Sequence, residues 1–240
     1  MIEIKGLKKR FGTKDVLKGV DLHIPKGKTT VILGLSGGGK STIIKHIVGL
    51  LKPDSGEIWV DGEKINQADE KQIRKIRKKI GFLFQNGALF DSMNIFENVA
   101  FALREHTNMS ENEIMHKVVE KLEMVGLKPS EVLELYPNEL SGGMRKRVGL
   151  ARTIALDPKI ILYDEPTSGL DPITSDLITQ MIIKLQKRLN VTSVLISHDI
   201  KESFKAGDYF AMLHDGKIIE TADAKHFKNT TNPFIRQFLH

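Results

Sequence analysis

The sequence predicts an α/β fold, with a core of parallel strands, an N-terminal antiparallel part and an inserted helical subdomain. The first observation is a glycine-rich loop, Gly34–Thr42, which follows the apolar run Thr29–Leu33 and precedes a run with helical spacing. The second is a pair of continuous apolar runs, Ile160–Tyr163 and Val194–Ile196, which suit buried parallel strands. The third is a stretch of helical character between about residues 88 and 152.

The loop Gly34–Thr42 fits the phosphate-binding pattern G-x-x-x-x-G-K-[ST], in the strand–loop–helix setting that this pattern requires. Glycines let the backbone N–H groups turn around an anion, and the positive end of the next helix points at the same place. Lys40 would reach the β- and γ-phosphates, and the Ser41 hydroxyl would ligate Mg²⁺. The alternative is a glycine-rich turn that happens to contain a lysine. The loop predicts binding of a nucleoside triphosphate, which kinases, switches, motors and pumps all share.

The N-terminal part alternates apolar and polar residues, as half-buried strands do. The alternation covers Ile2–Lys5 and Val20–Ile24, which ends at the turn Pro25–Gly27. After the phosphate-binding loop, apolar residues recur at helical spacing over Ile43–Leu51. Pro53–Gly56 is expected to stop this helix.

A hairpin and a basic helix are expected next. Asp61-Gly62 supplies the positive φ angles of a tight turn, so residues 57–65 read as a hairpin. The densest basic run, residues 71–79, is interpreted as a solvated helix face, because no nucleic-acid recognition motif accompanies it. A short apolar strand, Ile80–Phe84, then leads to Gln85.

Helix-capping patterns mark the inserted helical subdomain. Asn94 with Glu97, and Ser110 with Glu113, have the spacing of an N-cap residue and a reciprocal acidic partner. Each pair precedes a run with apolar residues at helical spacing. These patterns predict at least two helices in this region.

The α/β core is expected to resume with the strand Ile160–Tyr163. A long helix should begin near Pro172 and run through Leu189, followed by the strand Val194–Ile196. Asp215-Gly216 marks a final hairpin.

The length of 240 residues suits one large domain or two small ones, and the apolar content of 40% is ordinary for a globular protein. We expect a single domain, residues 1–240. Within it, residues 1–87 and 153–240 are expected to form the nucleotide-binding α/β core, and residues 88–152 the helical subdomain. No apolar run approaches the ~18–20 residues of a membrane span, and the early basic residues do not suit a signal peptide. The chain is therefore expected in the cytoplasm.

Charge and cysteine content narrow the chemistry. The chain has no cysteine, which excludes disulfides and thiol catalysis. The net charge of +6 fits an anionic membrane surface or simple solubility as well as nucleic acid. Because no recognition motif is present, a nucleic-acid partner is not expected.

Two acidic residues follow the apolar run Ile160–Tyr163. Asp164 and Glu165 would stand at the carboxyl end of a buried strand, where ligands bind in open α/β sheets. Asp164 can hold Mg²⁺ through water, and Glu165, expected on the other face of the pleat, can act as general base toward the attacking water. The alternative is that both acids cap the following segment.

The combination of motifs resembles the ATP-binding-cassette (ABC) ATPases over about residues 2–222. The residues that carry the resemblance are Leu140-Ser141-Gly142-Gly143-Met144, then Asp164-Glu165-Pro166-Thr167-Ser168-Gly169-Leu170-Asp171-Pro172, and later Ser197-His198. The resemblance implies the ABC ATPase fold around a phosphate-loop core. It also implies ATP hydrolysis, with ATP and Mg²⁺ as the ligands.

The same resemblance implies roles for single residues. The catalytic residues would be Glu165, His198 at the γ-phosphate and Gln85 at the lytic water. The metal ligands would be Ser41, Gln85 and Asp164. The nucleotide would be bound by Phe11 at the adenine, by Gly34, Ser36, Gly37, Gly38, Gly39, Lys40, Ser41 and Thr42 at the phosphates, and by Ser141, Gly142 and Gly143. Phe11 could instead belong to the core, and Ser168–Asp171 would couple two sites across a dimer.

The residue types of the signature segment, Leu140–Met144, are also suited to anion binding on physical grounds. Its serine and glycines would open a helix, so that backbone N–H groups and a hydroxyl point at an anion. One chain supplies one copy of each half-site, which favours an isologous dimer. The resemblance implies that two chains sandwich two ATP molecules head to tail. In the ABC family, this second half-site comes from another chain.

The signature segment also departs from the commonest ABC pattern, because Met144 stands in place of glutamine and cannot donate amide hydrogen bonds. With methionine at this position, the segment resembles that of the ATPases of lipid-trafficking transporters of the Mla type (maintenance of lipid asymmetry). Further similarities to these ATPases lie in Arg145-Lys146-Arg147, Phe84–Phe90, Asn94–Val99, Leu103–His106 and Asp171–Ser175.

The leading hypothesis is the motor subunit of a membrane ABC transporter that moves phospholipid or another hydrophobic substrate across or between bacterial membranes. Its partners would be a second copy of the chain and an integral membrane permease, with a small cytosolic regulator and a periplasmic lipid-binding protein as further candidates. The permease would hold it at the inner face of the cytoplasmic membrane. The alternatives are an importer ATPase for polar solutes such as amino acids, and a soluble ABC ATPase outside transport.

Overall fold

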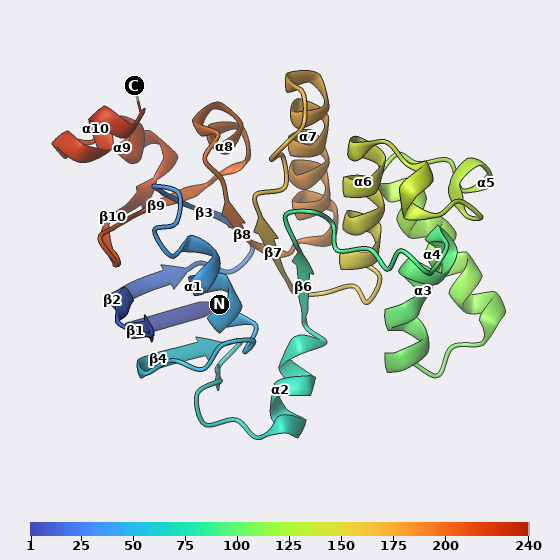
Figure 1. Ribbon diagram of the computed structural model, residues 1–240, viewed down its shortest axis with the longest axis horizontal. Helices are drawn as coiled ribbons and strands as arrows, with labels where there is room; N and C mark the ends of the chain where they lie inside the picture. The colour runs from blue at the N-terminus through green and yellow to red at the C-terminus, as the bar shows by residue number, and fades with distance from the viewer. Residues whose placement is uncertain (240) are drawn as a thin grey trace. The chain divides into compact units, whose positions relative to one another are not determined.

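The computed structural model describes residues 1–239, which form two compact units (Figure 1). The first unit joins Met1–Arg77 to the segment from Val191 onward, and the second is Lys78–Asn190. The predicted helical subdomain, residues 88–152, lies within the second unit. Its separation from the rest of a single domain stays a prediction.

An antiparallel sheet opens the first unit, as the alternating pattern predicts. Its order is β2-β1-β4-β5, with β1 Ile2–Phe11, β2 Lys14–Ile24, β4 Ser55–Val60 and β5 Glu63–Lys64. Buried and exposed residues alternate at the start of β1, because one face of the sheet packs on the core. Asp61 and Gly62 have φ angles of 52° and 82°, which confirms the predicted hairpin turn.

Parallel strands form the core of the first unit. Their order is β10-β9-β3-β8, with β3 Thr29–Gly34, β8 Thr192–Ile196, β9 Tyr209–His214 and β10 Lys217–Asp223. β3 pairs in parallel with both β8 and β9, and β10 returns antiparallel beside β9. Every residue of β3 and β8 is buried, as expected for strands covered on both faces. Asp215 and Gly216, with φ angles of 45° and 74°, confirm the last predicted hairpin.

The helices of the first unit include one that is shorter than predicted. Their bounds are α1 Lys40–Ile47, α2 Glu70–Arg77, α8 Ile200–Ala206, α9 Ala224–Lys228 and α10 Pro233–Leu239. α1 ends before Leu51, because Val48 caps it and Gly49 adopts a left-handed φ of 69°, a conformation that ends helices.

The C-terminal tail packs on the first unit itself. Ile235 of α10 is fully buried, and the ring centroid of Phe234 lies 3.9 Å from that of His214. His240, the last residue of this tail, lies outside the described residues.

The second unit combines two parallel strands with a group of helices. The strands are β6 Ile80–Leu83 and β7 Ile160–Asp164. The helices are α3 Ile95–His106, α4 Glu111–Met124, α5 Pro129–Val132, a 3₁₀ helix Pro137–Glu139, α6 Gly142–Thr153 and α7 Pro172–Leu189. The capping boxes predicted at Asn94 and Ser110 are both formed. Across residues 1–239, no helix combines the length and the apolar character needed to cross a bilayer.

A buried lysine ties α4 to the turn before β7. The side chain of Lys121 is 1% exposed and its Nζ donates to Asp157 Oδ1 at 2.6 Å, while Lys117 Nζ lies 2.7 Å from Asp157 Oδ2. Burial by itself would raise the pKa of Asp157, but hydrogen bonds from Lys117 and Lys121 outweigh it and the pKa lies below its ordinary value. Asp157 therefore stabilises the unit while it is ionised.

Asp157→Asn should lower the free energy of unfolding by about 1–3 kcal/mol at neutral pH, because Lys121 loses a charged acceptor. Asparagine tolerates the φ of 48° at this position, so the substitution isolates the charge. The advantage of the wild type should be complete above the ordinary carboxyl pKa of about 4 and should vanish as the pH falls through the lowered pKa of Asp157.

Urea unfolding over a pH series measures this difference. Glu105→Gln, which changes an exposed carboxylate of α3, is the matched control and should leave stability unchanged. A loss that stayed the same at neutral and strongly acidic pH would contradict the assignment.

Candidate functional site

The phosphate-binding loop joins β3 to α1, and two of its glycines leave no room for a side chain. At Gly34, φ is 151° and a Cβ atom would lie 2.4 Å from the carbonyl oxygen of Leu213. At Gly39, φ is 103° and a Cβ atom would lie 2.9 Å from Val16 Cγ1. Glycine at these positions therefore permits the tight backbone path on which an anion-binding loop depends.

Lys40 is held inside this loop by backbone carbonyl groups. Its Nζ donates to the carbonyl oxygens of Gly34 at 2.8 Å and Leu35 at 3.0 Å, and the residue is 5% exposed. Lys40 is also the first residue of α1, whose N-cap, Gly39, contributes no side-chain acceptor. A buried cation at the start of a helix is well suited to hold phosphate.

A pocket of about 500 Å³ opens beside the loop in the first unit. It is lined by Leu35–Gly38, by Lys14–Val16 of β2 and by Leu213–Gly216 after β9. The last two segments are absent from the predicted site. Asp215-Gly216 predicts only a turn, and the parallel pairing of β9 with β3 is needed to bring this turn to the loop.

His198 lies at the same edge of the sheet as the phosphate-binding loop. β8 runs parallel to β3, with Ile196 opposite Ile32, so both strands end at this edge. His198 follows the strand and is exposed. Phe11, at the end of β1, is 45% exposed and its ring lies 5.6 Å from Lys9 Nζ, so the alternative that it belongs to the core is wrong.

In the second unit, β6 and β7 bring two of the three predicted catalytic residues together, Gln85 and Glu165. Because the two strands run parallel, the residues that follow them meet at one edge. Gln85 Nε2 donates to Glu165 Oε2 at 3.3 Å and to Ser168 Oγ at 3.2 Å. Asp164 is the last residue of β7 and is 8% exposed.

The prediction that strand alternation turns the Glu165 side chain is wrong. Glu165 lies outside β7 and has a φ of 48°, a left-handed conformation that is uncommon for residues other than glycine. A turn of the backbone, rather than the pleat, directs its carboxylate toward Gln85. Strained backbone positions of this kind cluster at functional sites.

The signature segment forms the start of α6, as predicted. Ser141 is the N-cap, and its Oγ accepts from the N–H of Met144 at 3.3 Å. A Cβ atom on Gly143 would lie 2.6 Å from Thr174 Cγ2, so the start of α6 packs tightly against the start of α7. Asp171 caps α7, and its hydrogen bond from the Thr174 hydroxyl is the main cause of its lowered pKa.

One side of α6 holds the loop after β6 at three levels. Lys146 Nζ donates to the main-chain oxygen of Gln85. One turn further, a Cβ atom on Gly149 would lie 3.1 Å from Gly87 Cα, and Arg152 Nη2 donates to the Gly87 carbonyl oxygen at 3.0 Å. Burial lowers the pKa of Lys146 and of Arg152. Neither cation is a predicted site residue, because a basic helical residue reads as solvent-exposed until its neighbours are known.

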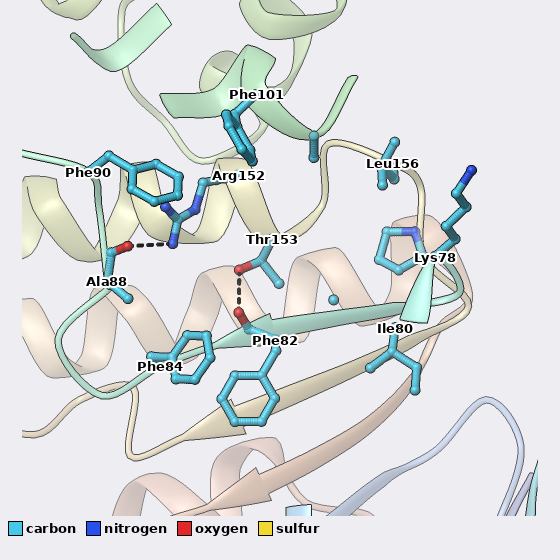
Figure 2. A pocket seen from close by; sticks show the side chains of 13 residues that line it. Lys78, Ile80, Phe82, Phe84, Ala88, Phe90, Phe101, Arg152, Thr153 and Leu156 are labelled. Atoms are coloured by element: carbon cyan, nitrogen blue, oxygen red, sulfur yellow. Dashed lines mark hydrogen bonds between the residues drawn. The ribbon is translucent and has the colours of Figure 1, made fainter. Parts of the chain in front are cut away.

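The same loop borders an apolar groove of about 330 Å³ in the second unit (Figure 2). Phe90 and Phe101 are 42% and 39% exposed, and their ring centroids are 5.1 Å apart. The guanidinium of Arg152 lies 5.4 Å from the centre of the Phe90 ring, and Phe82 and Phe84 also line the groove. Exposed apolar surfaces of this kind are typical of protein–protein and membrane interaction sites.

The predicted Mg²⁺ ligands are divided between the two units. Ser41 belongs to the first unit, and Gln85 and Asp164 belong to the second. Within residues 1–239, no group of three His, Asp or Glu side chains could hold a metal ion. The predicted set is nevertheless a suitable one, since Mg²⁺ in nucleotide sites takes one or two carboxylates and completes its shell with phosphate and water.

The α/β fold and the glycine loop define a class of protein, the phosphate-loop proteins that bind nucleoside triphosphates. Comparisons with known proteins refine this class. The sequence profile described as ABC transporter matches residues 17–168. Among solved structures, the ATP-binding cassette MJ0796, in a dimeric post-hydrolysis state bound to ADP and Pi, has a TM-score of 0.86 and 36% identity, covering 94% of this chain and 100% of that one.

Three relatives match nearly the whole chain. The intermembrane phospholipid transport system ATP-binding protein MlaF is 42% identical in Haemophilus influenzae and 41% identical in Escherichia coli K12, over 100% of this chain and 90% and 88% of those proteins. The probable ribonucleotide transport ATP-binding protein mkl of Mycobacterium leprae is 43% identical over 99% of this chain and 68% of that protein.

The chain therefore belongs to the ABC transporter family. It is an ATP-hydrolysing cassette with the fold of that family. The predicted family, fold class and ATPase activity are confirmed, and the roles of single residues stay predictions.

Proposed function

We propose that this chain is the ATP-hydrolysing motor subunit of a membrane transporter that moves phospholipid or another hydrophobic substrate across or between bacterial membranes. The observation that carries the proposal is the 41–42% identity to the MlaF phospholipid-transport proteins over the whole chain. The mycobacterial relative is named for ribonucleotide transport, but this chain covers only 68% of it. Import of polar solutes is therefore the weaker alternative.

ATP would bind with its phosphates on the loop Gly34–Thr42. Lys40 would exchange one of its carbonyl acceptors for an oxygen of the β- or γ-phosphate. Phe11 would stack on the adenine, and His198 would contact the γ-phosphate. The backbone N–H groups at the start of α1 would bind the remaining phosphate oxygens.

Hydrolysis would depend on the residues that follow β6 and β7. The Glu165 carboxylate would accept a proton from the attacking water, and Gln85, which donates to that carboxylate, would orient the water. Ser41, Asp164 and Gln85 would hold Mg²⁺, which neutralises charge on the phosphates. The two carboxylates thus have separate tasks.

Two copies of the chain would complete each other's sites. The start of α6, with Ser141, Gly142 and Gly143, would close over the γ-phosphate of ATP bound to the second copy. The dimeric state of the similar cassette with ADP and Pi supports this arrangement. In this arrangement, ATP binding closes the dimer and hydrolysis loosens it, and the predicted helical subdomain, residues 88–152, would transmit the motion.

The proposed membrane partner is a permease subunit, which would dock its apolar cytoplasmic segment in the groove around Phe90 and Phe101. The relatives are named as the ATP-binding protein of a transport system, which implies separate subunits for translocation. The groove is exposed and apolar, with Arg152 at one ring face. Docking here would hold the chain at the inner face of the cytoplasmic membrane. A small cytosolic regulator and a periplasmic lipid-binding protein would complete the system.

Glu165→Gln should reduce ATP turnover by on the order of 10²-fold or more, because the amide cannot accept the proton. ATP binding should persist, so an ATP-bound dimer should accumulate. Steady-state hydrolysis and size-exclusion chromatography with light scattering measure the two effects. Glu134→Gln, which changes an exposed carboxylate of the same unit, is the control; wild-type turnover in Glu165→Gln would remove Glu165 from the role of base.

Phe101→Asp should prevent copurification with the permease from detergent-solubilised membranes, because a carboxylate would be buried at the contact. The ATPase activity of the isolated chain should be unchanged. Met109→Asp, at an equally exposed apolar residue that does not line the groove, is the matched control. Normal copurification of Phe101→Asp would place the permease elsewhere.

The assembled transporter, reconstituted in proteoliposomes, should transfer fluorescently labelled phospholipid when ATP is supplied. The same preparation carrying Glu165→Gln should not, because the chemical step is blocked. ATP-driven accumulation of amino acids or nucleotides, with no transfer of lipid, would refute the proposed cargo.

A further inference from the structure

We propose that Lys146 is a positioning residue for ATP hydrolysis, which aligns Gln85 and Glu165 with the signature helix α6. The proposal rests on the function proposed above, in which Glu165 acts as the base. It depends only on contacts within the second unit.

Lys146 is buried, although lysine side chains ordinarily reach solvent. The residue is 6% exposed. Its Nζ donates to the main-chain oxygen of Gln85, and the side-chain Nε2 of the same glutamine donates to Glu165 Oε2 at 3.3 Å. A continuous chain of hydrogen bonds therefore runs from α6, through one residue, to the proposed base.

The positive charge of Lys146 explains why its side chain lies near an acceptor and a carboxylate. An ammonium group inside a protein is costly unless acceptors or an opposite charge compensate it. The Gln85 carbonyl supplies an acceptor, and the Glu165 carboxylate attracts the ammonium electrostatically. The cation thus attracts the Glu165 carboxylate at the edge where that carboxylate would meet the attacking water.

Further contacts hold Gln85, the residue that links Lys146 to Glu165, in one position. Its Nε2 also donates to Ser168 Oγ at 3.2 Å. Two residues further along the loop, Gly87 is held by the close approach of Gly149 and by the hydrogen bond from Arg152. Of the three α6 residues that contact this loop, Lys146, Gly149 and Arg152, it is Lys146 that bonds to Gln85, the partner of the proposed base. Loss of Lys146 should therefore displace Gln85 and Glu165 while Arg152 still holds the rest of the loop.

Three substitutions separate the hydrogen bond from the charge. Lys146→Met removes both, Lys146→Gln retains a donor, and Lys146→Arg retains the donor and the charge. The full chain is used, with steady-state ATP hydrolysis for kcat and KM, fluorescence of a labelled ATP analogue for affinity, and thermal unfolding for stability.

Lys146→Met should lower kcat on the order of 10- to 100-fold, the usual effect of misplacing a reacting group. KM and nucleotide affinity should stay within about twofold, because the phosphate-binding loop is untouched. At least one donor-retaining variant should restore kcat to within about threefold of the wild type. Lys187→Met, at an exposed lysine of α7, is the control and should leave all three quantities unchanged.

Two results would overturn the proposal. One is a wild-type kcat in Lys146→Met. The other is a parallel fall of kcat, affinity and thermal stability that neither donor variant reverses, which would show a merely structural lysine. If Lys146→Met does not fold, Lys146→Ala, which also removes the donor and the charge, takes its place with the same expected and overturning results.

Glu165→Gln, measured in parallel, separates this proposal from the proposed function. An active Glu165→Gln would remove the base itself. An inactive Glu165→Gln beside a fully active Lys146→Met would overturn only the positioning role.

Discussion

Parallel pairing of strands is the constraint on which the rest of this protein depends. In the first unit, β8 and β9 flank β3 in parallel, so the phosphate-binding loop, His198 and the turn after β9 share one edge. In the second unit, β6 and β7 do the same for Gln85, Asp164 and Glu165. Because such strands are buried on both faces, polar chemistry can be placed only where they end.

Backbone carbonyls hold three cations, of which Lys40 and Lys146 are buried and Arg152 is partly buried. Lys40 donates to Gly34 and Leu35, Lys146 to Gln85, and Arg152 to Gly87. A cation held by carbonyl oxygens can exchange one of these acceptors for a phosphate oxygen. This suits Lys40, which would turn toward a nucleotide, whereas Lys146 and Arg152 fix the course of the loop itself.

Helix α6 connects the functional surfaces of the second unit. It begins at the signature segment, contacts the loop of Gln85 within its second turn and presents Arg152 to the apolar groove near its end. Its 12 residues span roughly 18 Å as one rigid element. A transporter needs such an element, because ATP hydrolysis must be coupled to conformational changes in a membrane partner.

The sequence by itself determined those features that depend on a few consecutive residues. The glycine loop, the capping boxes at Asn94 and Ser110, the helix start at Ser141, and the turns at residues 61–62 and 215–216 follow from local backbone geometry, and the motifs of the chain identified its family. Two local predictions were nevertheless wrong, the end of α1 and the direction of the Glu165 side chain. In both cases a left-handed backbone conformation, at Gly49 and at Glu165, interrupted the helical or strand periodicity. Only the tertiary structure decided the lining of the pocket beside the phosphate-binding loop, the apolar groove and the contact of Lys146 with Gln85. These join residues far apart in the chain, 61 positions in the case of Lys146 and Gln85, and which segments become neighbours depends on strand order and helix packing rather than on any local pattern.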